Sequence, residues 1–386
     1  MAERVAALDY ERFNIDPNRG FLPNTEPLAS FGADAQPFLN ELDELGTSLP
    51  KLLETDQLRP RVRGLEAPSS EFFDGLTDRE LARIYTVTGF LANAYVHKID
   101  ANTAKTIPAG VAVPLYESTA RLGATPVLSY DGYVLYNWIR EDSEHDLLPQ
   151  NVRSITNFFA PGDERWFIAI HVAIENGAGP AIAAIGDAQQ GVLEDDPVRV
   201  ADALRTMKQS LREITDILNR MPERNEPEMY GNGFRPYLKP LTGVEYEGVA
   251  ALDGRQSFRG ASGAQSSILP ALDAALGIDH GNNPLVGHLR TLRRDMPTAH
   301  REFIETVRSG PDIREYVSNA DEELKAAYND CIDSMVVFRD DHIDVVAKYI
   351  EGPLDESEGT GGTPFSRYLR TFTDDTEDSR ISSPAK

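Results

Sequence analysis

The sequence predicts an all-α protein with two domains, on the basis of the chain length and two helical patterns. At 386 residues the chain can form one large domain together with a smaller one. Near the C-terminus, apolar side chains spaced by four and three fall on one helix face: Leu324, Tyr328, Cys331, Met335, Phe338, His342, Val345 and Tyr349. A second such repeat follows Asp195-Asp196-Pro197, a typical helix start: Leu204, Met207, Leu211, Ile214 and Leu218.

The domain boundary is placed at residues 141–146, an acidic polar run with the composition of a linker. The prediction is therefore a smaller N-terminal domain at 1–145 and a large helical domain at 146–386. Further helices are expected at 38–49, 76–97, 165–184 and 268–276, and at a start signal at 296–298. Residues 127–136 suit either a strand–turn–strand pair or a helix entry, and the polar tail 371–386 is expected to be mobile.

Composition narrows the classes of partner. The formal net charge of −24 argues against nucleic acid or an anionic membrane as the main partner, because both surfaces are negative. The single cysteine, Cys331, excludes an internal disulfide and any multi-cysteine metal site, and it suits a reducing compartment. No signal peptide and no apolar run of membrane-spanning length is expected. We expect a soluble cytoplasmic protein that binds a small ligand or another protein.

Two histidines occupy apolar helical positions. His342 lies within the C-terminal stripe, and His171 lies within the apolar segment 167–175. Either one can be a buried structural histidine that is hydrogen-bonded to a carbonyl group. Two imidazoles on separate helices, without cysteines or clustered acids nearby, suit a heme better than zinc, which needs three or four protein ligands. The absence of a Cys-x-x-Cys-His motif means that a heme would be bound without thioether links.

Three further segments could contact a ligand. Arg235 lies among glycines, aromatics and a proline at 231–238, where a guanidinium can clamp a carboxylate, although an unspecialised surface arginine is the alternative. Residues 258–267 are small, so they form either a linker or a place where backbone approaches a flat ligand; phosphate binding is a weaker third choice. Gly359–Thr363 reads as a flexible loop, or as a loop that closes on substrate.

These segments resemble a known family. Arg339-Asp340-Asp341-His342, followed by residues 345–350, resembles the proximal-histidine helix of the indoleamine 2,3-dioxygenases, heme enzymes that open the indole ring of tryptophan. Residues 130–138, 258–277, 296–301 and 359–363 resemble further segments of that family in the same order. The resemblance runs from about 113 to 372, and we expect a bacterial-type member with heme b as cofactor. The mobile loop would lie near 352–364, and the N-terminal domain would cover the distal side of the heme.

The resemblance implies a role for each matching position. His342 resembles the proximal iron ligand, Arg339 and Asp273 the charged pair behind the heme, and Arg235 the clamp for the amino-acid carboxylate. The other matching positions divide into heme or substrate contacts of the small-residue loop, substrate walls and a contact of the closing loop. They are Ser262, Gly263 and Ala264 in the first group, Phe167, Tyr130 and Tyr133 in the second, and Thr360 in the third.

Four residues depart from the family pattern. His171 stands where a serine is usual and resembles the distal histidine of tryptophan 2,3-dioxygenases, so we assign it a catalytic role. Tyr230 and Gly231 replace two phenylalanines, and Tyr133 replaces a smaller residue. The predicted function is conversion of L-tryptophan to N-formylkynurenine with O2, with a reductant for ferric heme. The alternatives are a heme oxygenase or peroxidase on another indole, a heme-based sensor in which His171 binds the iron, or a helical scaffold.

Overall fold

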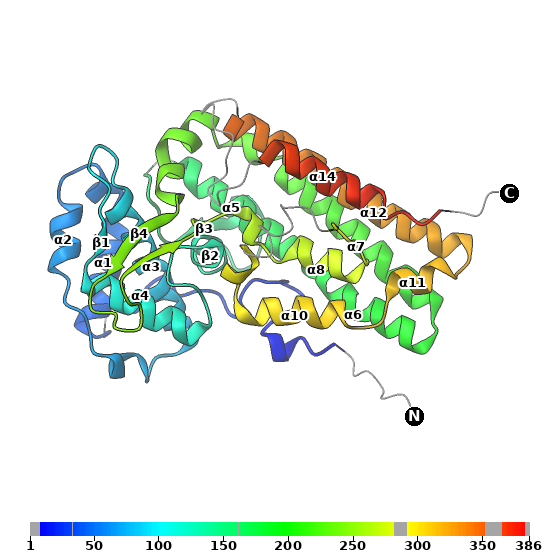
Figure 1. The fold of residues 1–386 in the computed structure, drawn as a ribbon, viewed down its shortest axis with the longest axis horizontal. Coiled ribbons are helices and arrows are strands. Elements are labelled where there is room, and N and C mark those ends of the chain that lie inside the picture. Colours follow the sequence, from blue (N-terminus) through cyan, green and yellow to red (C-terminus); the bar gives the residue numbers. More distant parts are fainter. Residues whose placement is uncertain (1–7, 33, 161, 282–291, 352–364, 383–386) are drawn as a thin grey trace.

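The computed structural model describes residues 8–32, 34–160, 162–281, 292–351 and 365–382. It is predominantly helical, which confirms the predicted all-α class. The longer helices are α1 (Pro37–Leu53), α2 (Leu58–Gly64), α3 (Asp78–His97), α4 (Ala109–Leu122), α5 (Gly162–Gly177), α6 (Gly179–Glu194), α7 (Pro197–Leu218), α8 (Ile268–Ala275), α10 (Thr298–Arg308), α11 (Ile313–Ser318), α12 (Glu322–Val346) and α14 (Phe365–Glu377). Figure 1 shows α1–α4 at one end of the molecule and α6–α14 at the other, with α5 between them.

A small sheet at the α1–α4 end contains strands from before and after the predicted domain boundary. Strand β1 (Thr106–Ile107) pairs in parallel with β4 (Leu241–Tyr246), which pairs antiparallel with β5 (Arg255–Phe258). The N-terminal segment contacts the opposite end of the molecule, where the Tyr10 hydroxyl donates to the Ile182 carbonyl of α6 at 2.8 Å. Both connections cross the boundary expected at 145/146, so the division into two domains stays a prediction.

The acidic run at 141–146 is not a linker. It connects β2 (Trp138–Arg140) to β3 (Val152–Ser154), which pair antiparallel, and therefore belongs to the loop of a hairpin. Asn151 orders this loop by donating to the backbone carbonyls of Asp142, His145 and Asp146. Residues 131–135, left open between strand and helix, form a single π-helical segment, η3 (Asp131–Leu135).

The apolar segment expected as one helix at 165–184 is two helices. α5 ends at Gly177, and α6 begins at Gly179 with Pro180 in its first turn, where proline needs no backbone donor. Together they form the stretch Gly162–Glu194, the one segment within the described ranges with the length and composition of a membrane span. The expectation that no such stretch exists was wrong. Since 72% of its apolar window is buried within the protein, it is a core element.

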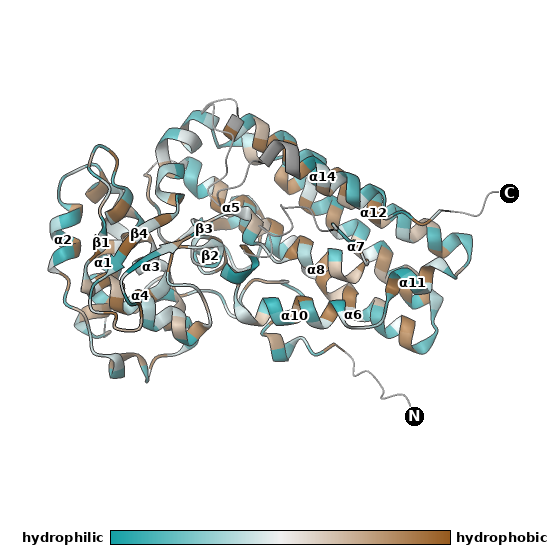
Figure 2. Cartoon of the chain, in the orientation of Figure 1, coloured by the Kyte–Doolittle hydropathy of each residue, from teal (hydrophilic) through white to brown (hydrophobic). Residues whose placement is uncertain are grey.

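The C-terminal helices pack as the periodicity predicts. α7 begins after Asp196, whose carboxylate accepts from the backbone of Val198 and Arg199, and its apolar face packs against α6 and α12. α12 begins after Asp321, which accepts from the backbone of Leu324, and its stripe is buried from Leu324 to Phe338. Figure 2 shows hydrophobic and hydrophilic residues alternating along the outer helices, as expected where each helix buries one face.

The C-terminal tail is more ordered than its composition suggested. Residues 371–377 belong to α14, which packs along α12, and the side chains of Phe372 and Thr376 are buried. The prediction of a mobile tail from residue 371 was therefore wrong for this stretch. α14 brings Leu369 and Phe372 to the same cavity that the C-terminal part of α12 borders.

Candidate active site

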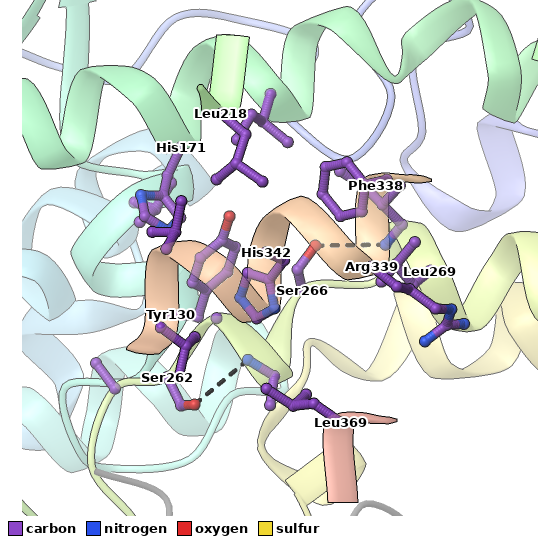
Figure 3. A pocket seen from close by; sticks show the side chains of 18 of the residues that line it. Tyr130, His171, Leu218, Ser262, Ser266, Leu269, Phe338, Arg339, His342 and Leu369 are labelled. Carbon is purple, nitrogen blue, oxygen red and sulfur yellow. Dashed lines mark hydrogen bonds between the residues drawn. The ribbon is translucent and has the colours of Figure 1, made fainter. Parts of the chain in front are cut away.

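A cavity of about 330 Å³ lies where α5, α8, α12 and α14 meet. Its walls are mostly apolar, and Figure 3 shows the side chains of His171 and His342 entering it from different helices. Most of the residues singled out from the sequence line it: Tyr130, Tyr133, Phe167, His171, Ser262, Gly263, Ala264, Asp273, Arg339 and His342. Segments far apart in the sequence are thus brought to one place.

His342 reaches the cavity from the last turns of α12. Burial, the nearby His171 ring and the Arg339 charge lower the pKa of His342 to about 4, so its imidazole is neutral at neutral pH. Within the described ranges no hydrogen bond involves the His342 ring. A neutral imidazole facing a cavity has a lone pair with which it can bind a metal.

His171 is fixed in one orientation. Its Nδ1 lies 2.8 Å from the carbonyl oxygen of Phe167, one turn earlier on α5. A carbonyl only accepts hydrogen bonds, so Nδ1 carries the proton. Burial lowers the pKa of His171 and keeps the ring neutral, which leaves a lone pair on Nε2. His171 can therefore accept a hydrogen bond or bind a metal through Nε2.

A buried ion pair adjoins His342. Arg339 Nη2 donates to Asp273 Oδ1 at 2.7 Å, and His280 Nε2 lies 3.1 Å from Asp273 Oδ2. Burial opposes the Asp273 charge, but Arg339 and His280 outweigh it and lower the pKa of this carboxyl group. His280 also lies 3.3 Å from Asp375 of α14. The Arg339–Asp273 pair expected from the sequence forms, and it connects α8, α12 and α14.

The small-residue loop is held against the wall that Tyr130 forms. Gln265 Oε1 accepts from the backbone of Tyr130 at 3.0 Å and of Ser262 at 3.1 Å. At Gly260 a Cβ atom would lie 1.8 Å from the Leu238 carbonyl oxygen, so only glycine allows this approach. The linker interpretation of 258–267 is therefore wrong, since the loop is packed and lines the cavity.

Two buried carboxyl groups were missed in the sequence. Glu164, Phe167, His171 and Glu175 are separated by three, four and four residues. This spacing places all four on one face of α5. The Tyr133 hydroxyl donates to Glu164 Oε1 at 3.1 Å, and the Tyr130 hydroxyl donates to Glu175 Oε1 at 2.9 Å.

Both carboxyl groups are fully buried, and burial outweighs their hydrogen bonds. It raises the pKa of Glu164 to about 8 and that of Glu175 to about 7. The spacing of the two acids could have revealed them, because it puts them on the same buried helix face as His171, where charged side chains are rarely found.

Two predicted contacts are not part of the cavity wall described here. Arg235 is buried, with 2% exposure, at the start of η7 (Arg235–Leu238), but it is not among the lining residues. Tyr230 and Leu238, which flank Arg235 in the sequence, do line the cavity. Thr360 and the loop near 352–364 lie outside the described residues.

The chain matches the model of the family described as indoleamine 2,3-dioxygenase over residues 9–379. It belongs to the indoleamine 2,3-dioxygenase family. Indoleamine 2,3-dioxygenase 1 of Rattus norvegicus is 32% identical over 97% of this chain and 96% of its own length. Indoleamine 2,3-dioxygenase 2 of Homo sapiens is 30% identical over 96% and 95%. Indoleamine 2,3-dioxygenase of Saccharomyces cerevisiae is 29% identical over 92% and 83%.

Membership of the indoleamine 2,3-dioxygenase family confirms the predicted class, a heme-dependent oxidoreductase that acts as a dioxygenase on tryptophan or a related indole. The expectation of a bacterial-type member is not confirmed, since these relatives are mammalian and fungal. The family match covers nearly the whole chain, including residues before 113 that the sequence resemblance left out.

The cavity fits the family's heme. Among the described residues no group of three or more histidines, cysteines or acids could hold a bare metal ion. One neutral imidazole suffices where a macrocycle supplies the other ligands of the metal. The walls are mostly apolar, and Arg293 and the Arg339–Asp273 pair border the cavity. The donor set therefore suits a heme and does not suit a bare metal ion.

Proposed function

We propose that the chain converts L-tryptophan to N-formylkynurenine by adding both atoms of O2 across the C2–C3 bond of the indole. The observation that carries the proposal is a mostly apolar cavity lined by two neutral imidazoles. His342 makes no hydrogen bond within the described residues, and the Phe167 carbonyl fixes His171. The cofactor would be heme b, whose iron supplies the oxygen chemistry when bound and needs a reductant in its ferric form. We infer a cytoplasmic location without a nucleic-acid or membrane partner, in keeping with the acidic charge.

His342 would hold the iron. Its low pKa means that no proton competes with the metal at neutral pH, and the Arg339–Asp273 pair beside it fixes the adjoining turn of α12. Ser262, Gly263 and Ala264 would contact the heme edge or the substrate, since their loop lines the cavity and is packed against Tyr130. We keep Thr360 as a proposed substrate contact from the sequence resemblance alone.

His171 would orient the substrate. Because its Nδ1 donates to Phe167, Nε2 is an acceptor, and the indole N–H is the one donor on the ring system of tryptophan. Phe167 and Tyr130 would stack against the ring on either side of this contact, since both pack against His171, at 4.3 and 6.1 Å between ring centres.

Arg235 would bind the substrate carboxylate. It is a buried guanidinium in a wall segment whose neighbours line the cavity, and a zwitterionic amino acid brings a carboxylate that needs such a partner. This role requires the side chain to come forward between Tyr230 and Leu238 when substrate enters. Indoles without a carboxylate would gain nothing from it.

A sensor is the second candidate function, and the free Nε2 of His171 favours it, because the same lone pair could bind the iron. The absorption spectrum of purified protein with heme separates the two. An enzyme should show a ferric spectrum without bis-histidine ligation, and with a reductant and L-tryptophan it should form N-formylkynurenine. A low-spin bis-histidine spectrum without product formation would instead support the sensor.

A further inference from the structure

His280, in the turn that follows α8, lies between two acids. Its Nε2 lies 3.1 Å from Asp273 Oδ2, and its Nδ1 lies 3.3 Å from Asp375 Oδ2, so each ring nitrogen has a carboxylate partner. The residue is 8% exposed, and its ring packs edge-on against Phe372 at 4.4 Å between ring centres. The imidazole is therefore held by two carboxylates and one aromatic ring.

These two contacts require a charged ring. An ionised carboxylate only accepts hydrogen bonds, so a ring nitrogen bonds to it only by donating, and the imidazolium alone has two N–H groups. Although burial opposes the charge of Asp273, Arg339 and His280 lower the pKa of its carboxyl group. Asp375 is 28% exposed, and its contact with solvent stabilises its charge. The geometry therefore fits His280 as an imidazolium.

The charges alternate from α14 to the turn of α12 that precedes the proposed iron ligand. Asp375 contacts His280, His280 contacts Asp273, and Arg339 Nη2 donates to Asp273 Oδ1 at 2.7 Å. We call these four residues the charge cluster, and its two positive and two negative groups give a net charge of zero. Asp273 and Arg339 line the cavity, whereas His280 and Asp375 do not. His280 is thus a second positive group that holds the acid of the buried pair.

Other charged groups around His280 have different partners. Arg314 of α11 donates to the Ser379 carbonyl at 3.4 Å, just after α14. The carboxylate of Asp279, next to His280 in the sequence, accepts from the Gly281 backbone at 2.9 Å. Among the described residues, the hydrogen-bond partners of the His280 ring are therefore the two carboxylates of the charge cluster.

We propose that His280, as an imidazolium, is a positioning residue for the iron site: it holds Asp273 and, through Arg339, sets the charge beside His342. The proposal rests on the function proposed above, because it takes His342 as the iron ligand. Groups that contact a ligand's neighbours tune a metal without touching it.

Loss of the His280 proton has two consequences. A neutral ring can donate to only one carboxylate, so one of its two contacts is lost. The net charge of the charge cluster also falls from zero to −1. A negative charge near an iron centre stabilises the ferric form against the ferrous form. As the pH rises and His280 loses its proton, the heme should therefore become harder to reduce.

Nuclear magnetic resonance measures the charge of the ring without turnover. The full-length protein is labelled with 15N-histidine and studied at pH 7 as its diamagnetic ferrous carbon monoxide complex. We expect both ring nitrogens of His280 to be protonated, with the signals assigned by their loss in His280→Gln. One protonated and one unprotonated nitrogen would overturn the proposal. The wild-type ring gives this result even if the variant fails to fold.

The ferric–ferrous equilibrium measures the effect on the iron. The heme-loaded protein is reduced with dithionite at a series of pH values, and the midpoint potential is recorded. As His280 loses its proton, we expect about a tenfold shift towards the ferric form, a fall of about 59 mV for a one-electron couple. His280→Gln carries a neutral side chain and should lose this step. Asp374→Asn is the matched control, since it removes an exposed carboxylate next to Asp375, and it should keep the step.

Turnover of L-tryptophan separates this inference from the proposed function. If the ring is doubly protonated and the potential step depends on His280 but tryptophan is not opened, the positioning role is correct and the reaction is wrong. If tryptophan is opened but the step persists in His280→Gln, the positioning role is wrong. A chain that binds no heme overturns both.

Discussion

His342 and His171 line the same cavity from different helices, yet their rings are held differently. His171 is bonded through Nδ1 to its own helix and is flanked on the α5 face by two buried acids whose pKa values burial raises. His342 has no such bond within the described residues and adjoins the charged Arg339–Asp273 pair. One ring is thus fixed with a single lone pair presented to the cavity, while the other can adjust to a metal.

The difference shows how one fold separates two uses of the same side chain. A ring that must bind a metal needs to be neutral at the working pH, and burial, the nearby His171 ring and the Arg339 charge lower the pKa of His342 accordingly. A ring that must read a substrate needs a fixed direction, which the Phe167 carbonyl supplies. Each variant below removes one side of this comparison, or a group that supports it.

His342→Ala should have the largest effect. Removing the proposed iron ligand should abolish stable heme binding, because no other described histidine apart from His171 faces the cavity. Heme content measured by pyridine hemochrome against protein concentration should fall to a small fraction of wild type. A variant that keeps its heme content and its turnover would show that α12 does not carry the ligand.

Arg235→Ala should lower kcat/KM for L-tryptophan about a hundredfold, because a charge-assisted, two-pronged contact in a dry pocket contributes a few kcal/mol. Turnover of indoles that lack the carboxylate should change little, and this pair of substrates is the internal control. Equal losses for both would mean that Arg235 supports the wall between Tyr230 and Leu238 and does not bind substrate.

Glu175 gives the α5 wall a dependence on pH. Its pKa is raised from 4.5 to about 7, so the folded state keeps a proton that the unfolded chain loses near pH 4.5. This proton stabilises the fold below pH 4.5, and its contribution declines as the pH rises to about 7, by on the order of 3 kcal/mol. Glu175→Gln mimics the neutral acid, so the free energy of unfolding of this variant should fall less steeply with rising pH than that of wild type. We attribute the remaining pH dependence to Glu164.

Urea unfolding followed between pH 4.5 and 8 measures this slope. Glu302→Gln is the matched control, because Glu302 is exposed on α10 and should leave the slope unchanged. A Glu175→Gln protein with the wild-type slope would show that Glu175 is ionised in the fold. The Tyr130 and Ser266 hydrogen bonds to Glu175 would then outweigh its burial.

Helical periodicity predicted the parts of this molecule where one face is buried. The stripe of α12 and the repeat of α7 could be read directly, because a buried helix face repeats every three or four residues. The break between α5 and α6 was visible in Gly177-Ala178-Gly179-Pro180 but was outweighed by the apolar composition around it. The polar composition of 371–377 concealed the C-terminal part of α14, in which Phe372, Thr373 and Thr376 are buried between more exposed residues.

The sequence predicted those site residues that are recognisable by their own side chain, and it missed those whose state depends on contacts with distant residues. His342 and His171 were found because an imidazole on an apolar face is conspicuous. Glu164 and Glu175 were missed because an acid is usually solvated, and only the fold brings Tyr133 and Tyr130 against them. The sequence also could not show that Arg235 is buried and absent from the cavity lining, since that depends on how η7 packs.

His171→Ser should have the smallest effect of the four, because it changes a preference and leaves the proposed iron ligand in place. If Nε2 accepts the indole N–H, wild type should use 1-methyl-L-tryptophan poorly, and the variant should narrow the gap between methylated and unmethylated substrate about tenfold. A serine hydroxyl is shorter and lacks the bond to the Phe167 carbonyl that aims the ring. If His171 binds the iron instead, the wild-type ferric spectrum should be low-spin and the variant high-spin. An unchanged spectrum together with an unchanged preference would leave His171 a structural residue of α5, held by the Phe167 carbonyl one turn before it and by the Phe167 and Tyr130 rings.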